Sequence, residues 1–176
     1  MGGRHPASLL TPPGQAGAAP TSPQLSRIAE DEHGHGSHVT SIAVSSRLTS
    51  DGKYNGMAPG ADLVVVRAFD ATGSASYADI ISGIAWVVDN ADRYGIRVLN
   101  CSFSAEPQSF YWDDPINQAV MEAWRAGIVV VASAGNAGPG AMTIGVPGNL
   151  PYVLTVGAMS DNYTPEDMAD DVLASF

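Results

Sequence analysis

Three of the chain's four histidines fall within six consecutive positions, in the stretch HGHGSHV at residues 33–39. Near neutral pH an imidazole performs two kinds of chemistry: it accepts and returns a proton, or it binds a metal ion. The cluster therefore favours a general base or a zinc site, and the simpler interpretation is that its members only pack or face water. The three residues are His33, His35 and His38.

The zinc hypothesis rests on the H-x-H-x-x-H spacing, which resembles the H-x-H-x-D-H motif of metallo-β-lactamase-like hydrolases. Ser37 stands in the place of that motif's aspartate, and no histidine follows His38. A catalytic zinc needs three protein ligands, so three imidazoles would suffice. A helix that begins near His35 would leave His33 outside it, however, and a zinc hydrolase is therefore the weaker alternative.

His35 differs from its two neighbours because a glycine lies on each side of it, at the expected start of a helix. This leaves its ring room to face a cleft and to meet an approaching chain. For His38 we expect packing within the helix, and for His33 a solvated position in the preceding loop. His35 is therefore the histidine that we expect to face a cleft.

Apolar patterning along the chain predicts an α/β fold, with a parallel β-sheet flanked by helices on both faces. Continuous apolar runs, typical of buried parallel strands, cover 62–69, 97–103, 127–135 and 152–158. Apolar residues at helical spacing cover 37–46, 77–94 and a segment that starts at Asp114–Pro115 and stops at Gly127. Sites in such sheets lie at the carboxyl ends of the strands, here CSFS and SAGN.

Composition limits the classes of function. The chain has 176 residues, of which 45% are apolar and 15% charged, and its net charge is −10. Without a basic patch, neither nucleic acid nor an anionic membrane surface is an expected partner. No apolar run reaches the roughly 20 residues of a membrane helix. The lone Cys101 excludes an intramolecular disulfide and a cysteine metal site.

The first 29 residues are rich in proline, glycine and alanine and show little periodicity. They predict a disordered or loosely attached arm at 1–29, and we expect the globular part to begin near Asp31. This segment also lacks the continuous apolar core of a signal peptide.

Six stretches, in this order, resemble the subtilisin-like serine proteases, or subtilases: GHGSHV, GMAPGADLVVVRAF, GSASYADIISGIAW, VLNCSFS, VVVASAGNAG and VPGNLPYVLTVGA. The resemblance covers residues 31–176 and implies part of a subtilase catalytic domain. It implies a subtilisin-like three-layer fold that is incomplete at both ends. Members of this family are usually secreted. The activity that it implies is serine endopeptidase activity, the hydrolysis of peptide bonds in an extended peptide or protein substrate.

The resemblance also assigns roles to particular residues. His35 is similar to the family's general base and Asn136 to its oxyanion donor, and we expect the two side chains to lie across a gap that a carbonyl group would fill. The alternative is that Asn136 is a turn residue that caps its strand. Ser104 stands where the family has glycine, which implies a narrower or tilted pocket. The substrate-binding residues implied in this way are Tyr77, Ser102, Phe103, Ser104, Ala134 and Gly135.

Two members of the subtilisin triad have no counterpart in the sequence. The triad aspartate lies about 30 residues before the histidine, and the serine more than about 150 after it. No aspartate precedes Asp31, and no segment resembles the family's G-T-S-M-A motif. We therefore expect the chain by itself to be inactive or weakly active. A non-catalytic peptide-binding module is the alternative, and exposed sheet edges favour oligomerisation.

No cofactor is expected from the residues, although calcium is implied by family resemblance on the loop at 45–56. This loop, SSRLTSDGKYNG, has one carboxylate, Asp51. Calcium prefers six to eight oxygen ligands, several of them from carboxylates. We therefore expect a calcium requirement weaker than the family's usual one.

Overall fold

The computed structural model describes residues 8–10, 24–26 and 30–176. Backbone contacts divide the chain into two compact units, Met1–Trp86 and Val87–Phe176, and each is described by itself. Two short strands, β1 (Ser8–Leu10) and β2 (Gln24–Ser26), fall within the predicted arm, and the rest of that arm lies outside the described residues.

The first unit contains a three-stranded sheet in the order β2-β1-β3. Strand β3 (Val65–Arg67) runs parallel to β1 and starts opposite Ser8. Helix α1 (His35–Val44) lies between β2 and β3 in the sequence, and helix α2 (Tyr77–Asp89) follows β3 and crosses the unit boundary. The apolar run at 62–69 therefore forms a strand, as predicted, although the paired part is shorter.

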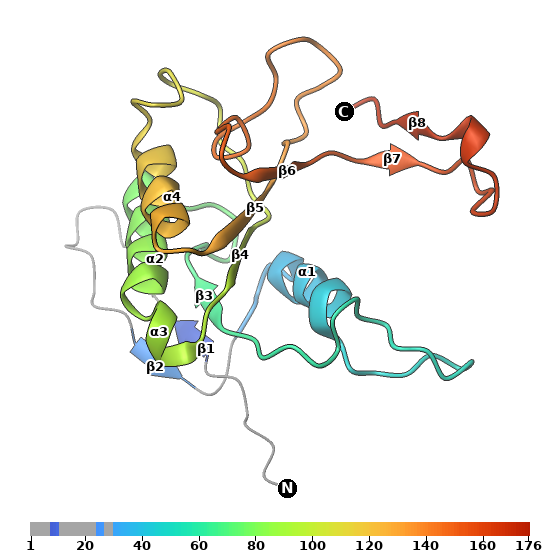
Figure 1. The fold of residues 1–176 in the computed structure, drawn as a ribbon, viewed down its shortest axis with the longest axis horizontal. Coiled ribbons are helices and arrows are strands. Elements are labelled where there is room, and N and C mark those ends of the chain that lie inside the picture. The colour runs from blue at the N-terminus through green and yellow to red at the C-terminus, as the bar shows by residue number, and fades with distance from the viewer. Residues whose placement is uncertain (1–7, 11–23, 27–29) are drawn as a thin grey trace, which may run out of the picture. The chain divides into compact units, whose positions relative to one another are not determined.

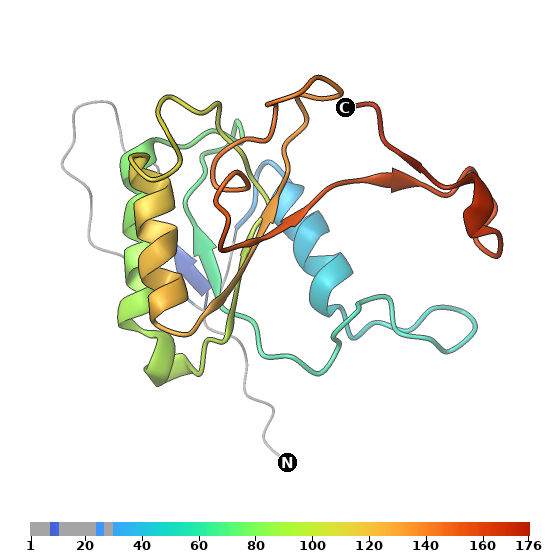
Figure 2. The same cartoon turned by 45° about the horizontal axis from the view of Figure 1, so that its top comes forward.

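After a long loop the chain returns to the C-terminal end of α1 and forms hydrogen bonds with it (Figures 1 and 2). The amides of Gly56–Ala58 donate hydrogen bonds of 2.8–3.0 Å to the carbonyls of Ile42, Ala43 and Ser45. A Cβ atom at Gly56 would lie 2.2 Å from the backbone nitrogen of Ser45. Glycine is therefore required where the two backbone segments meet, and this contact satisfies carbonyls that a helix end otherwise leaves to water.

The second unit is built on a parallel three-stranded sheet in the order β4-β5-β6. A small antiparallel hairpin, β7 with β8, extends away from this sheet (Figure 1). The bounds are α3 Ala91–Tyr94, β4 Val98–Cys101, α4 Pro115–Arg125, β5 Val129–Ser133, β6 Leu154–Val156, β7 Met159–Ser160, a 3₁₀ turn Met168–Asp170 and β8 Val172–Leu173. The predicted helix at 77–94 is interrupted at Asn90, which separates α2 from α3.

Helix α4 covers one face of this sheet and forms the core of the unit (Figure 2). Alternate residues of β5 are buried beneath it, as is Cys101 of β4. The α/β fold with a parallel sheet and flanking helices is confirmed. The buried side chains are Cys101, Ile116, Val120, Ala123, Val130 and Ala132. Other apolar strand residues are 48–60% exposed, in contrast to the continuous burial that the apolar runs predict: Val98, Val129, Leu154 and Val156.

Cys101 is the buried strand residue that its position predicts. It is 1% exposed, and burial raises the pKa of its thiol to about 12. The thiolate is the reactive form of cysteine, so this side chain acts as a small core residue. Among the described residues, no helix is long and apolar enough to cross a membrane.

The start of α4 is anchored by a buried carboxylate. Asp114 is fully buried and accepts hydrogen bonds from the amides of Ile116 at 2.9 Å and Asn117 at 3.3 Å. Pro115 occupies the first helical turn, so the predicted helix start at Asp114–Pro115 is confirmed. The side-chain amide of Asn117, also buried, donates to Asn149 at 2.9 Å and thereby ties the helix to the loop before β6.

Asp114→Ala should lower the free energy of unfolding by about 1–2 kcal/mol, since it removes the carboxylate oxygen that accepts from both buried amides. Urea unfolding followed by circular dichroism measures this loss. Asp113→Ala is the matched control, because that carboxylate is exposed and does not cap the helix. Equal effects of the two substitutions would show that the cap does not stabilise α4.

Candidate active site

His35 is the first residue of α1, and Asp31 holds it there. The residue before the helix, Gly34, has a left-handed backbone with φ 84°. The carboxylate of Asp31 accepts hydrogen bonds from the amide of Gly34 at 2.8 Å and from that of Ser37 at 2.6 Å. A Cβ atom at Gly36 would stand 3.5 Å from this carboxylate. Asp31 therefore caps the helix from four residues before His35.

These hydrogen bonds change the titration of Asp31. Donation from Ser37, and then from the amide of Gly34, lowers the pKa of the Asp31 carboxyl below 3.8, and the nearby His33 acts in the same direction. The carboxylate is exposed. It is therefore ionised through the neutral range and supplies a negative charge at the positive end of the helix.

The ring of His35 is exposed and stands next to a second imidazole. The ring centroids of His33 and His35 are 6.3 Å apart, with the planes at 85°. His33 also rests on the turn before α2, because a Cβ atom at Gly73 would lie 2.8 Å from its Nε2 atom. His33 is exposed in the loop before α1, as expected, and its ring also contacts a turn 40 positions away in the sequence.

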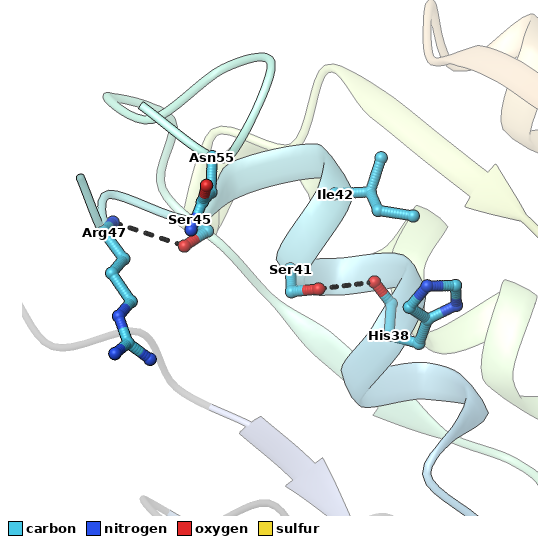
Figure 3. Close-up of a pocket in the computed structure, with 6 residues that line it drawn as sticks. All are labelled: His38, Ser41, Ile42, Ser45, Arg47 and Asn55. Atoms are coloured by element: carbon cyan, nitrogen blue, oxygen red, sulfur yellow. Dashed lines mark hydrogen bonds between the residues drawn. The ribbon is translucent and has the colours of Figure 1, made fainter. Parts of the chain in front are cut away.

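His38 is exposed rather than packed within its helix, which corrects the expectation for this residue. It lines an open pocket of about 430 Å³ along α1, together with side chains of the same helix and of the following loop (Figure 3). The Ser41 hydroxyl donates to the backbone carbonyl of His38 at 2.8 Å. The other lining residues are Ile42, Ser45, Arg47 and Asn55.

Neither metal hypothesis finds a ligand set. Among the described residues, no three His, Cys, Asp or Glu side chains are grouped so that they could hold a metal ion. The calcium hypothesis depends on Asp51, whose carboxylate accepts the Thr49 hydroxyl and pairs with the Lys53 ammonium at 3.4 Å. The loop thus places the Lys53 ammonium beside its only carboxylate, which favours the weak calcium requirement that the sequence predicts.

Tyr77 is the first residue of α2, and the position of this helix start is well defined. Ser76 and Asp79 form a capping box: the Ser76 hydroxyl accepts from the Asp79 amide at 3.2 Å, and the Asp79 carboxylate accepts from the Ser76 amide at 3.3 Å. Tyr77 is half-buried. The stretch from Gly73 to Tyr77 therefore has fixed ends: the turn against His33 and the capped helix.

Asn136 lies in the second unit, just beyond the carboxyl end of β5. Its side chain is exposed, and the preceding Gly135 has φ 92°, a conformation that favours glycine. Ala134 holds the turn on both sides: its amide donates to Val156 at 2.9 Å, and its carbonyl accepts from Gly145 at 3.1 Å. The turn that carries Asn136 is therefore fixed by backbone bonds, while its amide side chain stays accessible to solvent.

The CSFS segment lies beside this turn. The Ser133 hydroxyl donates to the carbonyl of Phe103 at 3.0 Å. A Cβ atom at Gly135 would lie 3.1 Å from the Ser104 hydroxyl, so that hydroxyl occupies the space beside the glycine. The Ser102 hydroxyl accepts from Asn100 at 2.8 Å. The structure thus brings together the groove residues predicted on two neighbouring strands.

Two glycines that we did not predict as site residues complete this region. A Cβ atom at Gly145 would lie 2.8 Å from the carbonyl of Ala105, and one at Gly148 would lie 2.4 Å from the carbonyl of Ser133. Ala105 and Val146 also exchange two backbone hydrogen bonds of 2.9 Å. Both glycines stand in the stretch GVPGN, but local spacing does not reveal which backbone a glycine meets.

The predicted site residues are divided between the two units. His35 and Tyr77 belong to the first, and Asn136 with the groove residues belongs to the second. The gap expected between the His35 ring and the Asn136 amide therefore stays a prediction.

The fold and these residues define an α/β protein whose polar side chains follow the carboxyl ends of parallel strands. Residues 16–172 match the model of the subtilase family. This match covers most of the chain, so the chain belongs to the subtilase family of serine proteases.

Individual relatives agree with this assignment. The chain is 41% identical over 152 residues to serine protease AprX of Bacillus subtilis, covering 83% of this chain and 34% of that protein. It is 36% identical over 134 residues to subtilisin DY of Bacillus licheniformis, covering 75% and 45%. Among solved structures, sphericase superimposes with a TM-score of 0.74 at 31% identity, covering 89% and 48%. The chain thus spans about a third to a half of the length of these relatives.

The Asp31 cap should be lost in acid. Because its folded-state pKa is lowered, its contribution is fully present above pH 3.8 and disappears as the pH falls through the folded value. NMR titration should show the Gly34 and Ser37 amide signals moving together below pH 3.8. Asp31→Ala should abolish this transition, and Glu30→Gln, a neighbouring carboxylate without the cap bonds, should retain it. A transition that survives Asp31→Ala would contradict this account.

Calcium should leave thermal stability unchanged, because Asp51 is engaged by Thr49 and Lys53. Thermal melts with millimolar calcium and with a chelator should agree within about 1 °C, since binding must favour the folded state to raise Tm. A calcium-dependent rise of several degrees that Asp51→Asn abolishes would show that the loop does bind the ion.

Proposed function

We propose that this chain carries two groups of a subtilisin-type serine endopeptidase: His35 as the general base and Asn136 as the oxyanion donor. The observation that supports the proposal most is the family match over residues 16–172, which includes both motifs in their expected order. Both side chains are exposed, and each stands at a backbone position held by local hydrogen bonds.

The chemistry assigned to these residues is acyl transfer. His35 takes the proton from an attacking serine hydroxyl and returns it to the leaving amine. The side-chain amide of Asn136 donates a hydrogen bond to the oxygen on which negative charge develops. In subtilisin, removal of the corresponding asparagine lowers the rate by about 10²–10³, and we expect a donor at Asn136 to contribute by a similar factor.

The substrate proposed for the site is an extended peptide segment of a protein. Phe103, Ser104, Ala134 and Gly135 form two adjacent backbone stretches at the carboxyl ends of β4 and β5. In the proposed binding mode, an extended peptide lies against these strand ends as an added strand, and the neighbouring side chains provide selectivity. The Ser104 hydroxyl against Gly135 supports the narrower pocket that the serine implies.

The 176-residue chain by itself should nevertheless lack efficient turnover. Its sequence has no aspartate before Asp31 and no segment that resembles the family's serine motif. Loss of the serine alone costs about 10⁶ in turnover in subtilisin. Binding of peptides without cleavage is therefore the second candidate function, and it uses the same groove.

The purified chain should not cleave casein, and a serine-directed phosphonate should not label it. If cleavage is found, genuine activity should fall by orders of magnitude in His35→Ala and by about 10²–10³ in Asn136→Ala. His38→Ala is the matched control, since this histidine lies on the same helix and lines a pocket to which His35 does not contribute. Activity that survives all three substitutions comes from a contaminating protease. Activity that is lost only with His35 and Asn136 would show that the chain holds its own nucleophile.

A further inference from the structure

The loop that leads from β4 into α4 contains three consecutive aromatic residues, Phe110, Tyr111 and Trp112 (Figure 1). The backbone carbonyl of each accepts a hydrogen bond from residues at the start of α4. The amides of the N-cap residue and of the residue before it donate to the carbonyl of Phe110 at 3.1 and 2.9 Å. The side-chain amides of Asn117 and Gln118 donate to the carbonyls of Tyr111 and Trp112 at 3.0 and 3.3 Å, respectively. The helix thus fixes the backbone of all three aromatic residues.

Two of these rings stack on one another and remain largely in solvent. The ring centroids of Phe110 and Trp112 are 4.7 Å apart, and the ring planes are inclined by 8°. Tyr111 is half-buried and meets Trp112 edge-on at 4.9 Å. Phe110 is 67% exposed and Trp112 is 55% exposed. The pair of Phe110 and Trp112 is therefore a preformed aromatic surface that faces solvent.

The charged side chains beside this aromatic pair are acidic. Asp113 follows the aromatic run directly, Glu106 lies four residues before it, and both are exposed. Within residues 30–176, neither carboxylate forms an ion pair. The sequence has no lysine or arginine at 98–124, and Arg125, the next one, pairs with Glu122. The loop thus presents aromatic rings and unpaired carboxylates without a basic side chain of its own.

We propose that the Phe110–Trp112 pair is a docking site for a polypeptide segment that carries an exposed arginine. A guanidinium group is planar and weakly hydrated, so it stacks on aromatic rings, and its N–H groups match the geometry of a carboxylate. Asp113 and Glu106 would accept these N–H groups beside the rings. A neutral ligand would leave both carboxylates unused, and a lysine ammonium is more strongly hydrated and has no flat face.

This inference goes beyond the proposed function, because it uses neither the general base nor the oxyanion donor. The expected selectivity is modest, since the site is open to water. A cation over an exposed ring corresponds to about twofold to fivefold in affinity. An exposed ion pair adds up to about fivefold, and this part weakens as the salt concentration rises.

The test uses the 176-residue protein and three acetylated hexapeptide amides that differ at one residue: arginine, its neutral isostere citrulline, or lysine. NMR titration measures Kd from the backbone amide signals of residues 106–114 and from the Trp112 indole N–H. The arginine peptide should bind about threefold to tenfold more tightly than the citrulline peptide, and also more tightly than the lysine peptide. The preference over citrulline should shrink at about 0.5 M salt.

Substitutions in the aromatic pair test the stacking. Trp112→Leu and Phe110→Leu should each lower the affinity for the arginine peptide by about twofold to fivefold. Both variants keep the backbone carbonyls that α4 holds, and circular dichroism checks that they are folded. Trp124→Leu is the matched control, because Trp124 is also exposed but packs against Tyr152 instead. It should leave the affinity unchanged.

A charge substitution tests the carboxylate without removing a ring. Asp113→Asn keeps the shape of the side chain and should reduce the preference for arginine over citrulline. Glu122→Gln removes the same charge from a carboxylate that Arg125 already occupies, and it should leave the preference intact. Equal losses in the two variants would show that only the net charge of the protein attracts the peptide, which would overturn the proposal.

Three other results would also overturn it: equal affinity for the arginine and citrulline peptides, equal affinity for the lysine peptide, or a preference that survives both Trp112→Leu and Phe110→Leu. A failure of all three peptides to shift the signals of residues 106–114 would do the same. If maltotriose, a neutral oligosaccharide, shifts these signals and the peptides do not, the aromatic pair is a carbohydrate site instead. None of these results bears on the proposed endopeptidase groups, which the casein assay tests separately.

Discussion

The candidate site in the first unit depends on the hydrogen bonds that the Asp31 carboxylate accepts from two amides at the start of the helix. A helix begins with amide groups that have no partner within it, and a preceding side-chain oxygen must supply one. Asp31 supplies two, to Gly34 and Ser37. The left-handed Gly34 and the small Gly36 allow the chain to bend closely around this carboxylate. As a result, His35 starts the helix with an exposed ring, and His33 is directed onto the Gly73 turn.

The second unit depends on a different constraint, the close approach of backbone segments without side chains between them. Gly145 lies against Ala105, and Gly148 lies against Ser133, at separations that no Cβ atom would tolerate. These contacts hold the loop before β6 against the ends of β4 and β5. The turn that carries Asn136 is positioned by the main-chain hydrogen bonds of Ala134 with Val156 and Gly145.

Periodicity predicted the elements because burial on one side imposes it locally. The continuous apolar runs correspond to β3, β4, β5 and β6, and the helical spacing to α1, α2 and α4. The same reasoning missed the break at Asn90, where apolar spacing continues although the helix does not. It also missed the exposure of Val98 and Val129, because a run of valines is the same whether one face of a sheet is covered or both.

The sequence by itself determined the types of element, their order, the family resemblance and the motif positions of His35 and Asn136, because each of these is carried by neighbouring residues. Only the tertiary structure decided which distant residues meet. It set His33 against Gly73, the Ser104 hydroxyl beside Gly135, and Lys53 opposite the carboxylate that calcium would need. Such contacts depend on the direction that each turn gives to the backbone, and a local pattern of apolar and polar residues does not specify that direction.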